Sequence, residues 1–144
     1  MNPILVALDA SPRAPHVLET ARGLALARGC KLDVFRAVTI PPEVPAEVFD
    51  VSPNELIAVL EKHARDDLAL LVKDVPTELV CNVRVGVGTP WHAICRAAKE
   101  SVAELIVIGS HGYGGIDRLI GTTAAKVVNH AETSVLVVRS RPHA

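Results

Sequence analysis

The sequence predicts an α/β protein: a five-stranded, doubly wound parallel sheet with helices on both faces. Three observations support this fold class. Short aliphatic runs alternate with segments of helical periodicity along the chain. Hydrophobic residues make up 49% of the chain and aromatic residues only 3%, so the core must be aliphatic. The aliphatic runs are nearly continuous, which is typical of strands that are covered on both faces.

Five aliphatic runs have the length and composition of buried strands. Each is rich in Val, Leu or Ile and is separated from the next by a loop and a helical segment. The predicted strands span residues 4–8, 32–38, 79–85, 105–108 and 134–138.

Helical segments fill the intervals between these strands. Ser11-Pro12 and Thr89-Pro90 each combine an N-cap residue with a proline at the first helical position, so each pair predicts a helix start. Gly29 is expected to end the first helix. Residues 56–71 carry an apolar stripe at helical spacing, and residues 122–131 predict a short last helix.

Length, charge and cysteine content narrow the class of protein further. The 144 residues predict one domain over residues 1–144. A net charge of −1 argues against a nucleic-acid partner or an anionic membrane partner. No apolar run reaches the length of a membrane span, and no signal-like segment precedes the first strand. Three cysteines without a CxxC pair fit a reducing compartment, so a cytoplasmic location is expected.

Two predicted strand ends carry residues that suit a phosphorylated ligand. In open parallel sheets, ligands bind beyond the carboxyl ends of the strands, where the strand order reverses. Asp9 follows the first strand, and its carboxylate can accept from a ribose hydroxyl or hold Mg²⁺ shared with phosphates. The glycine-rich segment 109–115 follows the fourth strand and leads to Gly121 at a helix start. Glycines and a helix N-terminus let main-chain N–H groups approach an anion, although the same glycines fit a simple turn equally well.

Several enzyme and signalling classes lack their required motifs in this chain. No Gly-x-x-x-x-Gly-Lys-[Ser/Thr] is present, and no Gly-x-Gly-x-x-Gly follows the first strand. An adenylating ligase on a related fold needs a Ser-Gly-Gly-x-Asp-Ser-like loop there, where this chain has Asp9-Ala10-Ser11. A receiver domain needs an Asp at the end of the third strand, which here ends in Val85-Gly86. No general base or nucleophile stands out, so no catalytic residue is predicted.

Taken together, these segments resemble the universal stress protein family over nearly the whole chain. The resemblance rests on residues 6–11, 88–90, 109–112 and 135–139. Nucleotide-binding members of that family carry Gly-x2-Gly, nine residues, and then Gly-[Ser/Thr]. Here Gly109 and Gly112 fit, but eight residues instead of nine separate Gly112 from Gly121. Non-binding members lack these glycines, so the chain is more similar to the binders.

The resemblance implies a sheet order of 3-2-1-4-5 and an ATP site at the reversal of that order. Asp9 would contact the ribose or hold Mg²⁺, Ala37 would contact adenine through its backbone, and any ATP hydrolysis would be slow. The implied nucleotide-binding residues are Ala7, Leu8, Asp9, Ala37, Ile108, Gly109, Gly112, Gly121, Thr122 and Thr123. Gly112 and the last three of these would hold the phosphates.

The resemblance also implies an assembly and a role. The last strand of the family often pairs with its two-fold mate, so a homodimer is expected through the strand that contains Val135 and Val138. The implied function is a stress-response or signalling module whose ligand occupancy biases partner binding. The alternative is a nucleotide-free dimer of the same fold that acts through its surface.

Overall fold

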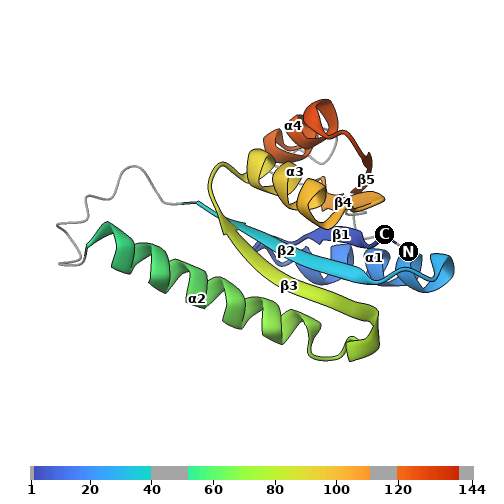
Figure 1. Cartoon of the computed structure of the whole chain (residues 1–144), viewed down its shortest axis with the longest axis horizontal. Coiled ribbons are helices and arrows are strands. Elements are labelled where there is room, and N and C mark those ends of the chain that lie inside the picture. Colours follow the sequence, from blue (N-terminus) through green and yellow to red (C-terminus); the bar gives the residue numbers. More distant parts are fainter. Residues whose placement is uncertain (1, 40–51, 111–119, 140–144) are drawn as a thin grey trace.

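A computed structural model describes residues 2–39, 52–110 and 120–139 of the chain. Within these residues, strands and helices alternate as the sequence predicts (Figure 1). The elements are β1 (Ile4–Ala7), α1 (Ala14–Arg28), β2 (Leu32–Val38), α2 (Pro53–Val72), the 3-10 turn η2 (Thr77–Leu79), β3 (Val80–Val87), α3 (Pro90–Ser101), β4 (Leu105–Gly109), α4 (Thr122–His130) and β5 (Ser134–Val138).

All five strands are parallel and lie in the order β3-β2-β1-β4-β5, which confirms the predicted fold class. The chain runs outward from β1 to β3 and then returns to the other side of β1 with β4. Ala7 therefore pairs with Phe35 of β2 on one side and with Ile108 of β4 on the other. The strand order reverses between β1 and β4, where parallel α/β proteins bind ligands.

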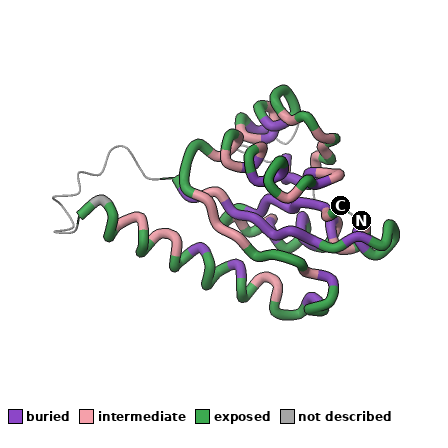
Figure 2. The backbone as a smooth tube through the Cα atoms, in the orientation of Figure 1, coloured by how far each residue is buried: buried purple, intermediate pink, exposed green. Residues whose placement is uncertain are grey.

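The helices form two layers, one on each face of the sheet. Figure 1 shows α1 and α2 on one side and α3 and α4 on the other. Successive residues of a strand point to opposite faces, so β1 contributes to both layers. Ile4 and Val6 pack with α1, whereas Leu5 and Ala7 pack with α3 and α4. Strand β1 is buried throughout and β2 and β4 are buried over most of their length, as the continuous aliphatic runs predict (Figure 2).

The start of α1 differs from the prediction. The helix begins at Ala14 with Arg13 as its N-cap, so Ser11 and Pro12 lie in a turn before it. Ser11 Oγ accepts from the Arg13 N–H at 3.2 Å, and the Ser11 carbonyl accepts from the Ala14 N–H at 3.2 Å. The Ser11 side chain, which was predicted to cap the helix, therefore closes a turn before the helix instead. The predicted stop is confirmed, because Gly29 ends α1 in the left-handed conformation with φ at 70°.

Helix α2 begins three residues before its predicted apolar stripe. Ser52 Oγ accepts from the Glu55 N–H at 3.2 Å, and the Glu55 carboxylate accepts from the Ser52 N–H at 3.3 Å. This reciprocal capping box supplies partners for two amides of the helix start. None of the helices in the described ranges is long and apolar enough to cross a membrane.

Candidate functional site

A cavity of about 760 Å³ lies at the carboxyl ends of β1, β2 and β4. Its volume is in the range of small-molecule sites. The starts of α1, α3 and α4 complete the lining. Most lining residues are aliphatic, with Asp9, Ser11, Thr39, Thr122 and Thr123 as the polar side chains among those described. A ligand here would therefore meet an apolar floor and a few directed polar groups.

Residues predicted from separate parts of the sequence meet in this cavity. The predicted residues that line it are Ala7, Leu8, Asp9, Ala37, Ile108, Gly109, Gly121, Thr122 and Thr123. They come together because parallel strands end at the same edge of the sheet and α4 begins beside that edge. The remaining predicted residue, Gly112, lies outside the described residues.

Several lining residues were not predicted. They are Ala10, Ser11, Ala14, Val17, Thr39, Pro90, Ile94, Ile120 and Ala124. Thr39 follows β2 just as Asp9 follows β1, so the strand-end rule applied to every strand would have found it. Val17 and Ile94 are apolar residues of helices, and nothing in their spacing distinguishes a cavity wall from a core position.

The turn after β1 is held by hydrogen bonds on both sides of Asp9. The Asp9 Oδ1 atom accepts from the Ser11 N–H at 2.9 Å. Arg36 donates from Nη2 to the Asp9 carbonyl at 2.9 Å and from Nε to the Leu8 carbonyl at 3.2 Å. A carboxylate has about four acceptor positions, so the Ser11 bond is compatible with a further bond to a ligand hydroxyl.

The start of α4 brings main-chain N–H groups to the cavity. Gly121 is the N-cap, so the N-cap residue itself has no side chain with which to cap the helix. The Gly121 N–H donates to the Ser110 carbonyl at 2.9 Å, so this amide is engaged within the protein. An anion would therefore be held by the amides and hydroxyls of Thr122 and Thr123, since first-turn amides lack partners inside the helix. The buried Gly121 contributes a position without a side chain at the cavity wall.

Asp9 is the acidic side chain among the described lining residues. In the part of the chain that the structure describes, no group of three or more His, Cys, Asp or Glu residues could hold a metal ion. A Mg²⁺ ion at Asp9 would thus need most of its oxygen ligands from phosphates and water, which is how Mg²⁺ is usually bound beside nucleotides.

The fold is that of a doubly wound α/β protein, with a cavity at the point where the strand order reverses. The chain belongs to the universal stress protein family, whose family model matches residues 1–139. It is similar to Universal stress protein A homolog 1 of Coxiella burnetii (strain RSA 493 / Nine Mile phase I), with 31% identity over 138 residues that cover 94% of each chain.

Solved structures share the fold. The universal stress protein UspA from Lactobacillus plantarum is 29% identical, with a TM-score of 0.76 and coverage of 96% of this chain and 97% of that one. A universal stress protein in complex with cAMP is 23% identical, with a TM-score of 0.72 and coverage of 97% and 98%. A universal stress protein from Archaeoglobus fulgidus in complex with dAMP is 23% identical, with a TM-score of 0.60 and coverage of 96% and 98%. The likeness to these last two shows the fold.

Proposed function

We propose that this protein binds ATP in the cavity at the ends of β1, β2 and β4 and acts as a stress-response or signalling module. One observation carries the proposal: residues predicted for one nucleotide site from three strand ends and a helix start line a single cavity of about 760 Å³. An apolar pocket with few convergent polar groups is the usual form of a small-molecule site.

The lining divides into a part for the nucleoside and a part for the phosphates. Ala7, Leu8, Ala37 and Ile108 offer aliphatic and main-chain surface to adenosine, and Asp9 offers its carboxylate to the ribose hydroxyls or to Mg²⁺. The start of α4 offers amides, hydroxyls and the positive end of its dipole to the phosphates. This division supports a nucleotide in preference to a purely apolar ligand.

Adenine nucleotides are known to bind proteins of this fold. Two of the solved structures are complexes with cAMP and with dAMP. These complexes support an adenine ligand here, and the choice of ATP comes from the family resemblance and the phosphate-binding character of the α4 start. We expect at most slow hydrolysis, because Asp9 would be engaged with the ribose or with Mg²⁺ and would not serve as a base.

We also propose that the protein forms a homodimer through β5. This strand is the edge of the sheet next to β4, and an uncovered aliphatic edge tends to pair with another strand. Leu136 on β5 is 36% exposed and Val128 on the adjacent α4 is 47% exposed. If the protein does not bind a nucleotide, the exposed residues of β5 and α4 favour the alternative function, in which a nucleotide-free dimer acts through its surface.

The test begins with the purified protein. Heating it and analysing the supernatant by chromatography should release an adenine nucleotide, and calorimetry on the emptied protein should show binding of Mg-ATP. Gly121→Val should bind Mg-ATP at least about tenfold more weakly, because a valine would occupy cavity space. Its backbone, with φ at −60°, is accessible to valine. Gly112→Val is expected to lose the nucleotide as well.

Gly23→Ala is the matched control, because Gly23 lies within α1 with open space around it. An empty supernatant together with no heat of Mg-ATP binding would overturn the nucleotide proposal. Light scattering on the wild type and on Leu136→Asp tests the dimer independently, since a charge at the edge strand should produce a monomer.

A further inference from the structure

Arg36 is a buried cation that the proposed function does not use. It lies on β2 immediately before Ala37 and is 6% exposed. Its guanidinium donates three hydrogen bonds: from Nε to the Leu8 carbonyl at 3.2 Å, from Nη2 to the Asp9 carbonyl at 2.9 Å, and from Nη1 to the Asp67 carboxylate at 3.2 Å. Two of these three acceptors belong to residues that line the cavity.

The two carbonyls belong to residues just beyond the last pairs that β1 forms with β2 and with β4, although the Leu8 N–H still donates to the Phe35 carbonyl at 2.9 Å. The ladder between β1 and β2 ends at the pair Ala7 and Phe35, so the Leu8 and Asp9 carbonyls lie beyond it. A buried carbonyl without a donor is costly, and Leu8 is only 2% exposed. Arginine offers five N–H donors in one rigid plane, so a single side chain can hold two successive peptide groups.

We infer that Arg36 is a positioning residue, which holds the turn after β1 so that Asp9 presents its carboxylate to the sugar of the bound nucleotide. The inference rests on the proposed nucleotide site. Arg36 holds the Asp9 peptide from the sheet side, and the Ser11 N–H holds the Asp9 carboxylate from the helix side at 2.9 Å. With both ends held, the carboxylate has a defined direction before any ligand arrives, which favours binding.

Asp67 on α2 offers a way to separate the two kinds of bond that Arg36 makes. Its side chain is 58% exposed, and an ion pair with an exposed partner contributes little. The carbonyl bonds should therefore carry the positioning, and the ion pair should not. Asp67→Asn keeps the shape of the side chain and removes its charge, which makes it a matched control for Arg36 variants.

The test measures discrimination between ATP and 2′,3′-dideoxy-ATP by calorimetry. We expect the wild type to prefer ATP by about tenfold, because Asp9 accepts from a ribose hydroxyl. The ratio of the two affinities should fall towards one in Arg36→Met and in Arg36→Lys, and likewise in Asp9→Asn. The double variant Arg36→Lys/Asp9→Asn should have the same ratio as Asp9→Asn alone. Asp67→Asn should keep the ratio of the wild type. Equal weakening of both ligands in Arg36→Lys, at an unchanged ratio, would show a purely structural role and overturn the inference.

Hydrogen exchange on the ligand-free protein separates this inference from the proposed function. If the wild type binds neither nucleotide, the proposed function fails, and the positioning of the turn is then decided by exchange alone. We expect the amides of residues 9–11 and of Arg13 to exchange about tenfold faster in Arg36→Lys than in the wild type, at unchanged protection of the α3 amides. Equal exchange in the two proteins would overturn the inference even where nucleotide binds. This comparison uses Arg36→Lys, so it holds even where Arg36→Met fails to fold.

Discussion

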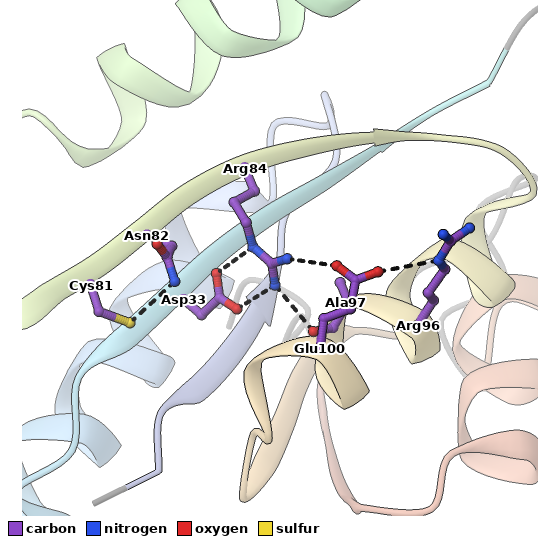
Figure 3. Close-up of polar contacts among 7 residues, drawn as sticks. All are labelled: Asp33, Cys81, Asn82, Arg84, Arg96, Ala97 and Glu100. Carbon is purple, nitrogen blue, oxygen red and sulfur yellow. Dashed lines mark hydrogen bonds and ion pairs between the residues drawn. The ribbon is translucent and has the colours of Figure 1, made fainter.

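Arg84 on β3 and Asp33 on β2 form an ion pair with two hydrogen bonds across neighbouring strands (Figure 3). Arg84 Nη2 lies 2.6 Å from Asp33 Oδ2, and Nε lies 3.1 Å from Oδ1. The hydrogen bond to Asp33 raises the pKa of Arg84 above its ordinary value. Arg84 also donates to the Ala97 carbonyl at 3.1 Å and to Glu100 at 3.3 Å, both on α3. One side chain thus joins the edge strand, its neighbour and a covering helix.

Loss of Arg84 should destabilise the protein strongly. Asp33 is completely buried, so Arg84→Met would leave a carboxylate in the interior without its cation. We expect a loss of about 3–5 kcal/mol in the free energy of unfolding, measured by urea denaturation. Arg96→Met is the control, because Arg96 is 74% exposed in its pair with Glu100 and should cost less than about 1 kcal/mol. Similar losses in the two variants would contradict this prediction.

Two glycine-to-alanine substitutions should change the stability of the protein in opposite directions. A Cβ at Gly86 of β3 would lie 2.8 Å from the Cζ atom of Phe35, whose ring is buried. Gly86→Ala should therefore destabilise by about 1–3 kcal/mol through overpacking. A Cβ at Gly23 of α1 meets nothing within 4 Å, so Gly23→Ala should stabilise by about 0.5–1 kcal/mol through helix propensity. Urea denaturation of both variants checks the signs, and a shared sign would refute the packing argument.

Replacing Val102 with glycine should make the protein more stable. It ends α3 in the left-handed conformation, with φ at 52° and ψ at 47°, which a β-branched residue rarely adopts. The residue is 63% exposed, so little buried surface is lost when its side chain is removed. Val102→Gly should stabilise by roughly 1 kcal/mol, the relief of strain exceeding the added chain entropy. Thermal unfolding of this variant and of Val102→Ala, which keeps a Cβ, tests this; a lower melting temperature for the glycine variant would refute it.

Glu104 should make stability depend on pH in the acid range. Its Oε1 atom accepts hydrogen bonds from Arg28 Nε at 2.8 Å and from the Cys30 thiol at 3.2 Å. The bond from Arg28 is the main reason why the pKa of Glu104 is below its ordinary value of 4.5. The unfolded chain therefore takes up this proton first as the pH falls. The contribution of Glu104 to the free energy of unfolding is fully present above about pH 4.5. It is lost as the pH falls through the lower pKa that Glu104 has in the folded state.

Glu104→Gln should remove this dependence. The melting temperature of the wild type should exceed that of the variant above about pH 4.5, and the difference should shrink below it. The control is Glu132→Gln, since Glu132 is 75% exposed in its pair with Lys99. A difference between the wild type and Glu104→Gln that stays constant from pH 3 to pH 6 would contradict the prediction.

Much of the fold and of the candidate site could be predicted because the responsible signals are local. Residues 32–38 and 134–138 were predicted as strands with the bounds that the structure has, since buried parallel strands need uninterrupted aliphatic runs. Asp9 and Gly109 were predicted as site residues because both lie at the carboxyl ends of strands, Asp9 just after the first and Gly109 at the end of the fourth. The sheet order that brings them together came from the family resemblance. The prediction that α1 starts at Ser11-Pro12 was wrong, because the Ser11 side chain forms an equally good hydrogen bond in a turn.

By itself the sequence determined the order of the elements, the aliphatic core and the strand ends at which the cavity lies, since each depends on residues close together in the chain. Only the tertiary structure decided the partners of Arg36 and Arg84, among them Leu8, which lies 28 residues from Arg36, and Asp33, which lies 51 residues from Arg84. It also decided that the Gly121 amide donates to Ser110. A hydrogen bond needs its donor and acceptor about 3 Å apart, and such proximity between distant residues exists only once the sheet has formed.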